Sequence, residues 1–203
     1  MNKVSKVVLL VGVVMLIMTG MAVASDISNT KHNLRSTGIN SAGTVGSLDE
    51  VCIYCHTPHG GNQAIAPLWN RLPGTTTFQV YTSATMTQTA AVSGTSVACM
   101  SCHDGVTSVN NLINVQGVNY TTGNTYLTGI AALGTDLRND HPIGVSVTTS
   151  GDPDIKAPTL TEVRVFSNLV ECASCHNVHD NTNTPFLRGS NAGSRLCLDC
   201  HSK

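Results

Sequence analysis

The sequence is poor in aromatic residues and in charge. Of its 203 residues, only 3 are Phe, 4 are Tyr and 1 is Trp, and charged residues make up 11%. The formal net charge of -1 offers no basic surface for nucleic acid, so a nucleic-acid partner is not expected. The length predicts one domain, or two small ones. With so little aromatic mass, another component has to fill the interior.

Long apolar runs are absent outside the first residues. Lys3 and Lys6 precede a nearly unbroken apolar stretch over residues 7–23, which ends in a small-residue Ala-Val-Ala cleavage site. This pattern predicts a secretory signal, residues 1–24, that is cleaved to leave 25–203 as the mature chain. The alternative is an uncleaved anchor, although the stretch is at the lower limit for a spanning helix. We therefore expect an exported protein.

Eight cysteines in an exported protein would ordinarily indicate four disulfides. Here they fall into four identical Cys-x-x-Cys-His frames, which is the motif that attaches c-type haem. The cysteines are Cys52, Cys55, Cys99, Cys102, Cys172, Cys175, Cys197 and Cys200. Two thiols on one turn can meet the two vinyl groups of a porphyrin while the next His reaches the iron. A disulfide scaffold, a zinc ribbon or a redox pair needs no such His. We expect four covalent haems, numbered 1 to 4 in chain order.

The eight histidines divide into two equal groups. Those that follow a cysteine pair are the predicted proximal iron ligands: His56, His103, His176 and His201. The others are the predicted distal ligands: His32, His59, His141 and His179. Methionine is a poor substitute, because four of the six lie in the predicted signal and Met100 lies inside a motif, which leaves Met86. Bis-His ligation without Met predicts low-potential haems.

The spacing of two distal candidates limits what they can bind. His59 and His179 each lie three residues after a proximal histidine. Two axial histidines on one iron have Cβ atoms ~12 Å apart, since two bonds of ~2 Å and two imidazoles separate them. Three residues span ~4.5 Å in a helix and at most ~11 Å when extended. Each should therefore ligate a neighbouring haem: we expect His59 on haem 2 and His179 on haem 4. His32 and His141 are then left for haems 1 and 3.

The fold class we expect is mostly irregular coil, with short helices at the motifs, a few short strands and a core built from haem. Each motif should open a helix of one to three turns. The stretch 125–133 could form short strands, although Gly interrupts it. Residues 25–203 should form one tetrahaem cytochrome c domain that is repetitive in motif and not in fold.

The C-terminal segment reads Cys172-Ala-Ser-Cys-His-x-x-His, then Pro185-Phe-Leu-Arg188, then a second Cys-x-x-Cys-His. It resembles the doubled module of multihaem c-type cytochromes from metal-reducing bacteria. Further similar parts are Cys52–Gly60, Ala66–Arg71, Cys102–Gly105 and Asn139–Pro142. The haem count and size are similar to outer-surface tetrahaem cytochromes that polymerise into extracellular filaments. The resemblance implies that His141 is a distal ligand and that His32 ligates a haem of the neighbouring subunit.

The expected function is electron transfer by a carrier that is not an enzyme, since every iron has two histidines to bind it. We expect a homopolymer at the outer cell surface or outside the cell, which exchanges electrons with redox partner cytochromes and external acceptors. One alternative is a soluble periplasmic shuttle with the same chemistry. Another is a haem reductase with one open iron, which would follow if His32 bound none. The third is a disulfide-stapled binding module.

Overall fold

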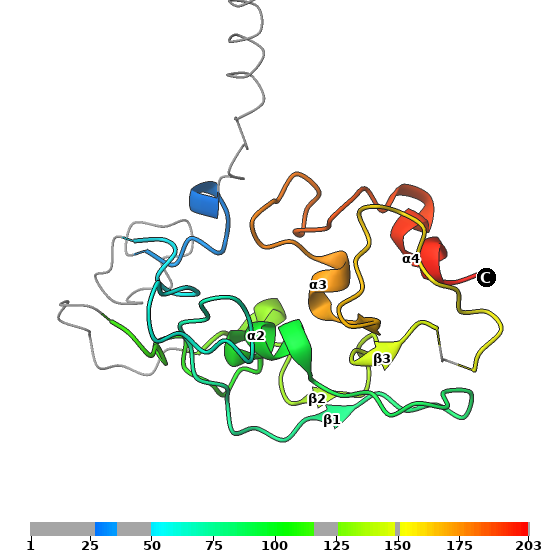
Figure 1. Ribbon diagram of the computed structural model, residues 1–203, viewed down its shortest axis with the longest axis horizontal. Helices are drawn as coiled ribbons and strands as arrows, with labels where there is room; N and C mark the ends of the chain where they lie inside the picture. Colours follow the sequence, from blue (N-terminus) through cyan, green and yellow to red (C-terminus); the bar gives the residue numbers. More distant parts are fainter. Residues whose placement is uncertain (1–26, 36–49, 116–125, 149–150, 203) are drawn as a thin grey trace, which may run out of the picture.

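The computed structural model describes residues 27–35, 50–115, 126–148 and 151–202. The predicted signal, residues 1–24, lies outside these ranges. Within them, no helix is both long enough and apolar enough to cross a membrane. The described chain contains few and short regular elements, which long irregular segments connect (Figure 1).

The helices are α2 (Gly94–His103), α3 (Cys172–Cys175) and α4 (Arg195–Cys200), with the 3-10 turns η1 (Ile27–Asn29), η2 (Gly129–Ala131) and η3 (Ala192–Ser194). The strands are β1 (Gln79–Val80), β2 (Asp136–Leu137), β3 (Val145–Ser146) and β4 (Leu169–Val170). β1 pairs with β2 in parallel, with Gln79 opposite Asp136. β3 pairs with β4 in antiparallel fashion, with Val145 opposite Val170. The two sheets are separate and have two strands each.

The helices do not generally open at the motifs, contrary to expectation. α2 ends at His103 and α4 ends at Cys200, so each finishes with its motif, while the first motif forms only turns. α3 alone begins at its first cysteine. The first, third and fourth motifs share one backbone bond, in which the His N–H donates to the first Cys C=O at 2.8, 3.1 and 2.9 Å. The motif thus specifies a single turn, and the preceding residues decide whether a helix leads into it.

The expected strand near residues 125–133 is wrong over the part that the structure describes. Residues 129–131 form η2 instead. Gly129 has φ +63°, a left-handed conformation that turns the chain away from an extended path. The backbone N–H of Leu133 then donates to the His103 carbonyl at 2.8 Å, which attaches this segment to the end of α2.

The described polypeptide has a small apolar interior. Nine apolar residues are buried, against thirteen polar or charged ones. The main apolar cluster is Tyr54 with Val109, bordered by partly buried neighbours that include Cys55 and Cys102. Several large apolar side chains stay exposed, and Ile130 is fully so. Apolar side chains of the described residues therefore form only a small core. That haem completes this core remains a prediction.

Two buried polar residues join the first two motifs. The Asn70 backbone N–H donates to Cys55 O at 2.8 Å, and its side-chain amide donates to Ile53 O at 2.7 Å. Arg71, fully buried, donates to the hydroxyl and the carbonyl of Ser101 at 3.1 and 2.9 Å. The second motif contains Ser101, so this dipeptide holds the first motif against α2.

Candidate functional site

In all four motifs, the residue before the second cysteine is buried. These residues are Tyr54, Ser101 and Ser174, each 1% exposed, and Asp199, 5% exposed. The flanking cysteines remain partly or fully exposed. The turn is therefore anchored to the protein by this position, while Cys52 and Cys197 are exposed and the other six cysteines are partly buried. Sequence reasoning missed the anchors, because the four side chains have no common chemistry.

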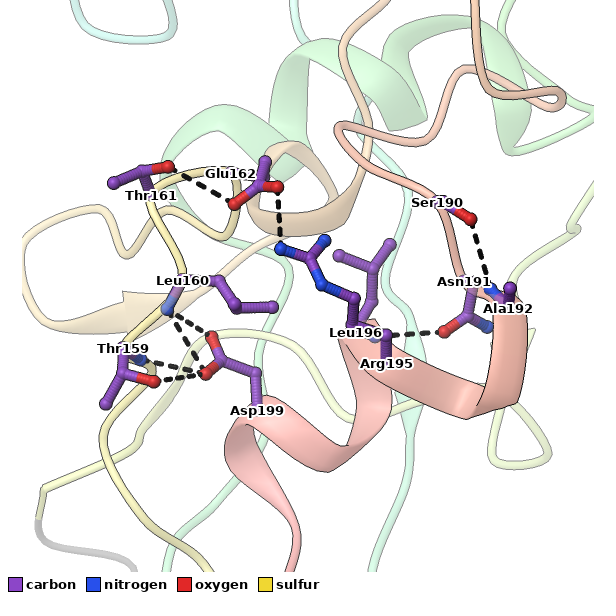
Figure 2. A network of polar contacts seen from close by, with 10 residues as sticks. All are labelled: Thr159, Leu160, Thr161, Glu162, Ser190, Asn191, Ala192, Arg195, Leu196 and Asp199. Carbon is purple, nitrogen blue, oxygen red and sulfur yellow. Dashed lines mark hydrogen bonds and ion pairs between the residues drawn. The ribbon is translucent and has the colours of Figure 1, made fainter.

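Asp199 shows how such an anchor fixes a motif (Figure 2). Its carboxylate accepts the backbone N–H of Thr159 at 2.9 Å, the Thr159 hydroxyl at 2.9 Å and the Leu160 N–H at 3.0 Å. Burial alone would raise the pKa of Asp199, but these hydrogen bonds outweigh it and the pKa is lowered. On the same helix, Arg195 pairs with Glu162 at 2.8 Å. α4 is thus fastened to the segment around residues 159–162.

Three of the four predicted proximal histidines have their Nδ1 fixed by a backbone carbonyl. His56 bonds to Pro67 O at 2.9 Å, His103 to Ala131 O at 2.7 Å, and His176 to Pro185 O at 3.0 Å. Because a carbonyl can only accept, Nδ1 carries the proton in each neutral ring, and Nε2 keeps its lone pair. Metal-binding histidines commonly have this arrangement. The residues present therefore fit an iron ligand at Nε2.

Six of the eight histidines lie in three ring pairs, each joining a predicted proximal ligand to a predicted distal one. The pairs are His103 with His32, His56 with His179, and His201 with His141, with centroids 6.1, 6.2 and 6.1 Å apart. Two imidazoles on opposite sides of one metal ion have centroids ~6 Å apart, because each metal–nitrogen bond is ~2 Å and each nitrogen lies ~1 Å from its ring centre. The spacing of all three pairs fits one iron.

The environment of His32 also suits a metal ligand. Burial, followed by the nearby His103 and His179, lowers the pKa of His32 to about 4, which favours the neutral imidazole that a metal binds. Its buried Nδ1 has no hydrogen-bond partner within the described residues. Phe186 packs edge-on against the ring at 4.5 Å. Within the described ranges no three His, Cys, Asp or Glu residues form a cluster that could hold a metal ion.

The ring pairs differ from the pairing expected from sequence. His179 lies against His56 of haem 1, where haem 4 was expected, and His141 lies against His201 of haem 4. His32, expected to reach another subunit, lies against His103 of its own chain. The long irregular segments bring residues together that are distant in sequence, and the assignment of each histidine to an iron stays a prediction. In none of the pairs does a histidine three residues after a proximal ligand meet that ligand, in keeping with the spacing argument.

Two histidines, His59 and His176, form no ring pair within the described residues. Both are exposed. His176 has its Nδ1 held by Pro185, as described, while the His59 carbonyl accepts from the side chains of Asn114 at 2.8 Å and Thr57 at 3.1 Å. The backbone at His59 is therefore fixed while its ring faces outward.

The cysteines of successive motifs are neighbours. Cys102 acts electrostatically on Cys55, Cys99 hydrogen-bonds with Cys172, and Cys197 acts on Cys175. Burial and then Cys102 raise the pKa of the Cys55 thiol to about 12. All eight thiols are free, so the structure contains none of the pairs that a disulfide scaffold would need. The attachment sites therefore follow one another in space in their chain order.

The first and third motifs are followed by the same local structure, although no repeat in fold was expected. In both, the chain returns through a loop that contains a proline, Pro67 or Pro185, and forms two backbone hydrogen bonds with the end of the motif. Cys55 O accepts from Asn70 N and Cys175 O from Arg188 N, both at 2.8 Å; Thr57 N donates to Leu68 O at 2.8 Å and Asn177 N to Phe186 O at 2.7 Å. Leu68 and Phe186 both have positive φ, 54° and 60°. Residues 52–71 thus form a structural counterpart of 172–188.

The doubled CXXCH motif family matches residues 167–203, which contain the third and fourth motifs. This match supports a multihaem c-type cytochrome-like protein, and the motifs indicate covalent attachment of haem c. Such motifs suggest an electron carrier. No curated protein matches the chain.

Proposed function

We propose that this protein transfers electrons through four covalently bound haems c, each ligated by two histidines. The observation that carries the proposal is the set of three proximal–distal ring pairs at 6.1–6.2 Å, each containing the His of a Cys-x-x-Cys-His motif. Haem supplies an iron that alternates between ferric and ferrous states. The sixteen predicted attachment and ligand residues are those named from the sequence.

The polypeptide contributes by holding the attachment sites rigid and in order. Buried anchors such as Ser101 and Asp199 fix each turn, and backbone carbonyls orient the proximal imidazoles. Cysteines of successive motifs lie near enough to influence one another's pKa, so neighbouring attachment sites are close together. Electron transfer requires such short separations, and a fixed ligand geometry limits the reorganisation that accompanies each step.

We further propose that a second copy of the chain completes haem 3, through His59 of one subunit and the His176 site of another. Both side chains are exposed and lack a ring partner within the described residues, while His32 has one in its own chain. His59 therefore replaces His32 as the bridging residue. Repetition of this contact would give an extracellular homopolymer that passes electrons to redox partner cytochromes and external acceptors.

The same two histidines define the alternatives. A soluble periplasmic shuttle would have the same chemistry without the contact between copies. If His59 bound no iron, haem 3 would keep an open position, as a haem reductase requires. The shuttle and the extracellular homopolymer both require that the signal is cleaved and that residues 25–203 are exported, which remain predictions.

The haem count tests the first part of the proposal. The intact mass of the exported protein should exceed that of the polypeptide 25–203 by four haem groups, and its pyridine haemochrome spectrum should give four haems c per chain. A mass equal to that of the polypeptide would refute haem attachment. Negative-stain microscopy of the haem-containing fraction tests assembly: thin filaments are expected, and a haem-containing monomer at all concentrations would favour the shuttle.

A further inference from the structure

The carboxylate of Glu171 lies buried between α2 and α3, immediately before the third motif. Glu171 is 2% exposed. Its carboxylate accepts the Ser93 hydroxyl at 2.8 Å, the Ser96 N–H at 3.3 Å and the Ser96 hydroxyl in a short hydrogen bond. The Ser174 N–H is a fourth donor to this carboxylate. The carboxylate accepts all four hydrogen bonds and donates none. This acceptor-only environment suits a charged carboxylate.

Glu171 caps two helices at once. It is the N-cap of α3, with a capping box that it shares with Ser174. It also takes the place of a cap for α2, because the N-cap residue Ser93 makes no side-chain cap bond and gives its hydroxyl to Glu171 instead. The Ser96 N–H, the third of α2, donates to the Ser93 carbonyl at 2.9 Å and also to the Glu171 carboxylate at 3.3 Å.

Gly94 makes this double cap sterically feasible. Its φ of +48° favours glycine, and a Cβ at this position would lie 2.9 Å from Glu171 Oε1. The carboxylate can therefore approach the first turn of α2 only because no side chain stands there.

The same contact joins the attachment sites of haems 2 and 3. The Ser96 hydroxyl donates to Glu171 and accepts the backbone N–H of Cys172 at 3.0 Å. One turn further along α2, Cys99 hydrogen-bonds with Cys172. A single fully buried serine thus bonds α2 to both Glu171 and the first cysteine of the third motif.

We propose that Glu171 is a positioning residue for electron transfer between haems 2 and 3, fixing the contact of their attachment helices and holding both haems at low potential through its buried charge. This inference rests on the proposed function. A negative charge in a poorly solvated site favours the ferric form of a nearby haem, which has one more positive charge than the ferrous form.

The substitution Glu171→Gln tests the electrostatic part. Glutamine has nearly the same shape and keeps one acceptor oxygen, but it removes the charge. In a spectroelectrochemical titration of the four-haem protein, the reduction steps of two of the four haems should shift upward, while haem content and far-UV circular dichroism stay the same. Asp136→Asn is the control, because Asp136 is exposed, pairs with Arg138 and belongs to none of the four motifs or their anchors; its titration should overlay the wild type.

The substitution Ser96→Ala tests whether this contact fixes α2 against α3. It tests the proposal even if the Glu171→Gln protein does not accumulate. It keeps the charge and removes the hydroxyl that links α2 to Glu171 and Cys172. We expect a weaker excitonic couplet in the Soret circular dichroism, which reports the separation and angle of neighbouring haems, together with a lower unfolding temperature. An unchanged couplet would overturn the positioning role.

The outcomes separate this inference from the proposed function. A wild-type protein without haem refutes the proposed function itself. A wild-type protein with four haems, and a Glu171→Gln variant whose four reduction steps coincide with those of the wild type, would overturn the electrostatic role of Glu171 alone.

Discussion

At the scale of single residues, each attachment site depends on a buried anchor and an oriented imidazole. The anchor is the residue before the second cysteine, which packs as Tyr54 or bonds as Asp199. The imidazole is oriented by a carbonyl such as Pro67 O or Ala131 O. The cysteines and the next histidine are then placed by one helical turn. The chemistry of the site is thus local, while the second histidine comes from elsewhere in the chain.

The substitution His179→Ala tests the pairing at this scale. It removes the ring that stacks on His56 at 6.2 Å with an interplanar angle of 18°. The electron paramagnetic resonance spectrum of the oxidised variant should show one more high-spin haem than that of the wild type in the same state of assembly. Histidine-selective ¹⁵N NMR should show the accompanying change at His56. A change at His201 instead would support the pairing first expected from sequence.

The sequence was informative where the chemistry is local and uninformative where it depends on the path of the chain. The cysteines and His56 could be predicted because the motif occupies five consecutive residues. The partner of His56 could not, because no local pattern tells which distant segment reaches it. Glu171 and Arg71 were missed for the same reason: a buried charge looks like any surface charge until its partners are known.

At the scale of elements, short helices are fixed by side-chain bonds from other segments. α4 has six residues and is too short to be stable alone. Asp199 ties it to residues 159–160, and Glu171 does the same for α2 and α3. The composition predicted few and short elements, but the boundaries depended on these long-range caps, so the expectation that helices open at the motifs was wrong for α2 and α4.

The substitution Asp199→Asn tests this dependence. Asparagine puts an NH2 donor in place of Oδ2, so the Leu160 N–H loses its 3.0 Å bond to that oxygen and faces a second donor. An unsatisfied buried donor costs ~1–3 kcal/mol, and the free energy of unfolding of the haem-loaded protein should fall by about that amount.

Asp136→Asn serves as the control for this measurement. Asp136 forms an exposed pair with Arg138, so its loss should leave the stability nearly unchanged. Equal effects of the two substitutions in thermal unfolding would show that the Asp199 contacts do not anchor α4.

At the scale of the whole molecule, folding is expected to require haem. The described residues bury few apolar side chains, and the attachment turns expose their cysteines. Chain produced without haem attachment should therefore be unfolded, with little helical signal in circular dichroism and rapid digestion by protease. A haem-free preparation with native-like protease resistance would contradict this expectation.

Assembly should depend on His59. His59→Ala removes the outward-facing ring proposed to complete haem 3 of another copy, and it should abolish filaments while the monomer keeps four haems. His32→Ala is the informative comparison, because it should add a high-spin haem within the monomer. Filaments of normal length from the His59→Ala variant would remove its bridging role.

The spin state of the haems, measured as a function of assembly, tests the central claim most directly. Electron paramagnetic resonance of the oxidised protein should show three low-spin haems and one high-spin haem in the isolated monomer, corresponding to the three ring pairs and the unpaired His176. Assembled material should show four low-spin haems. Fewer than three low-spin haems in a fully loaded monomer would show that the ring pairs do not bind iron, and would contradict the account.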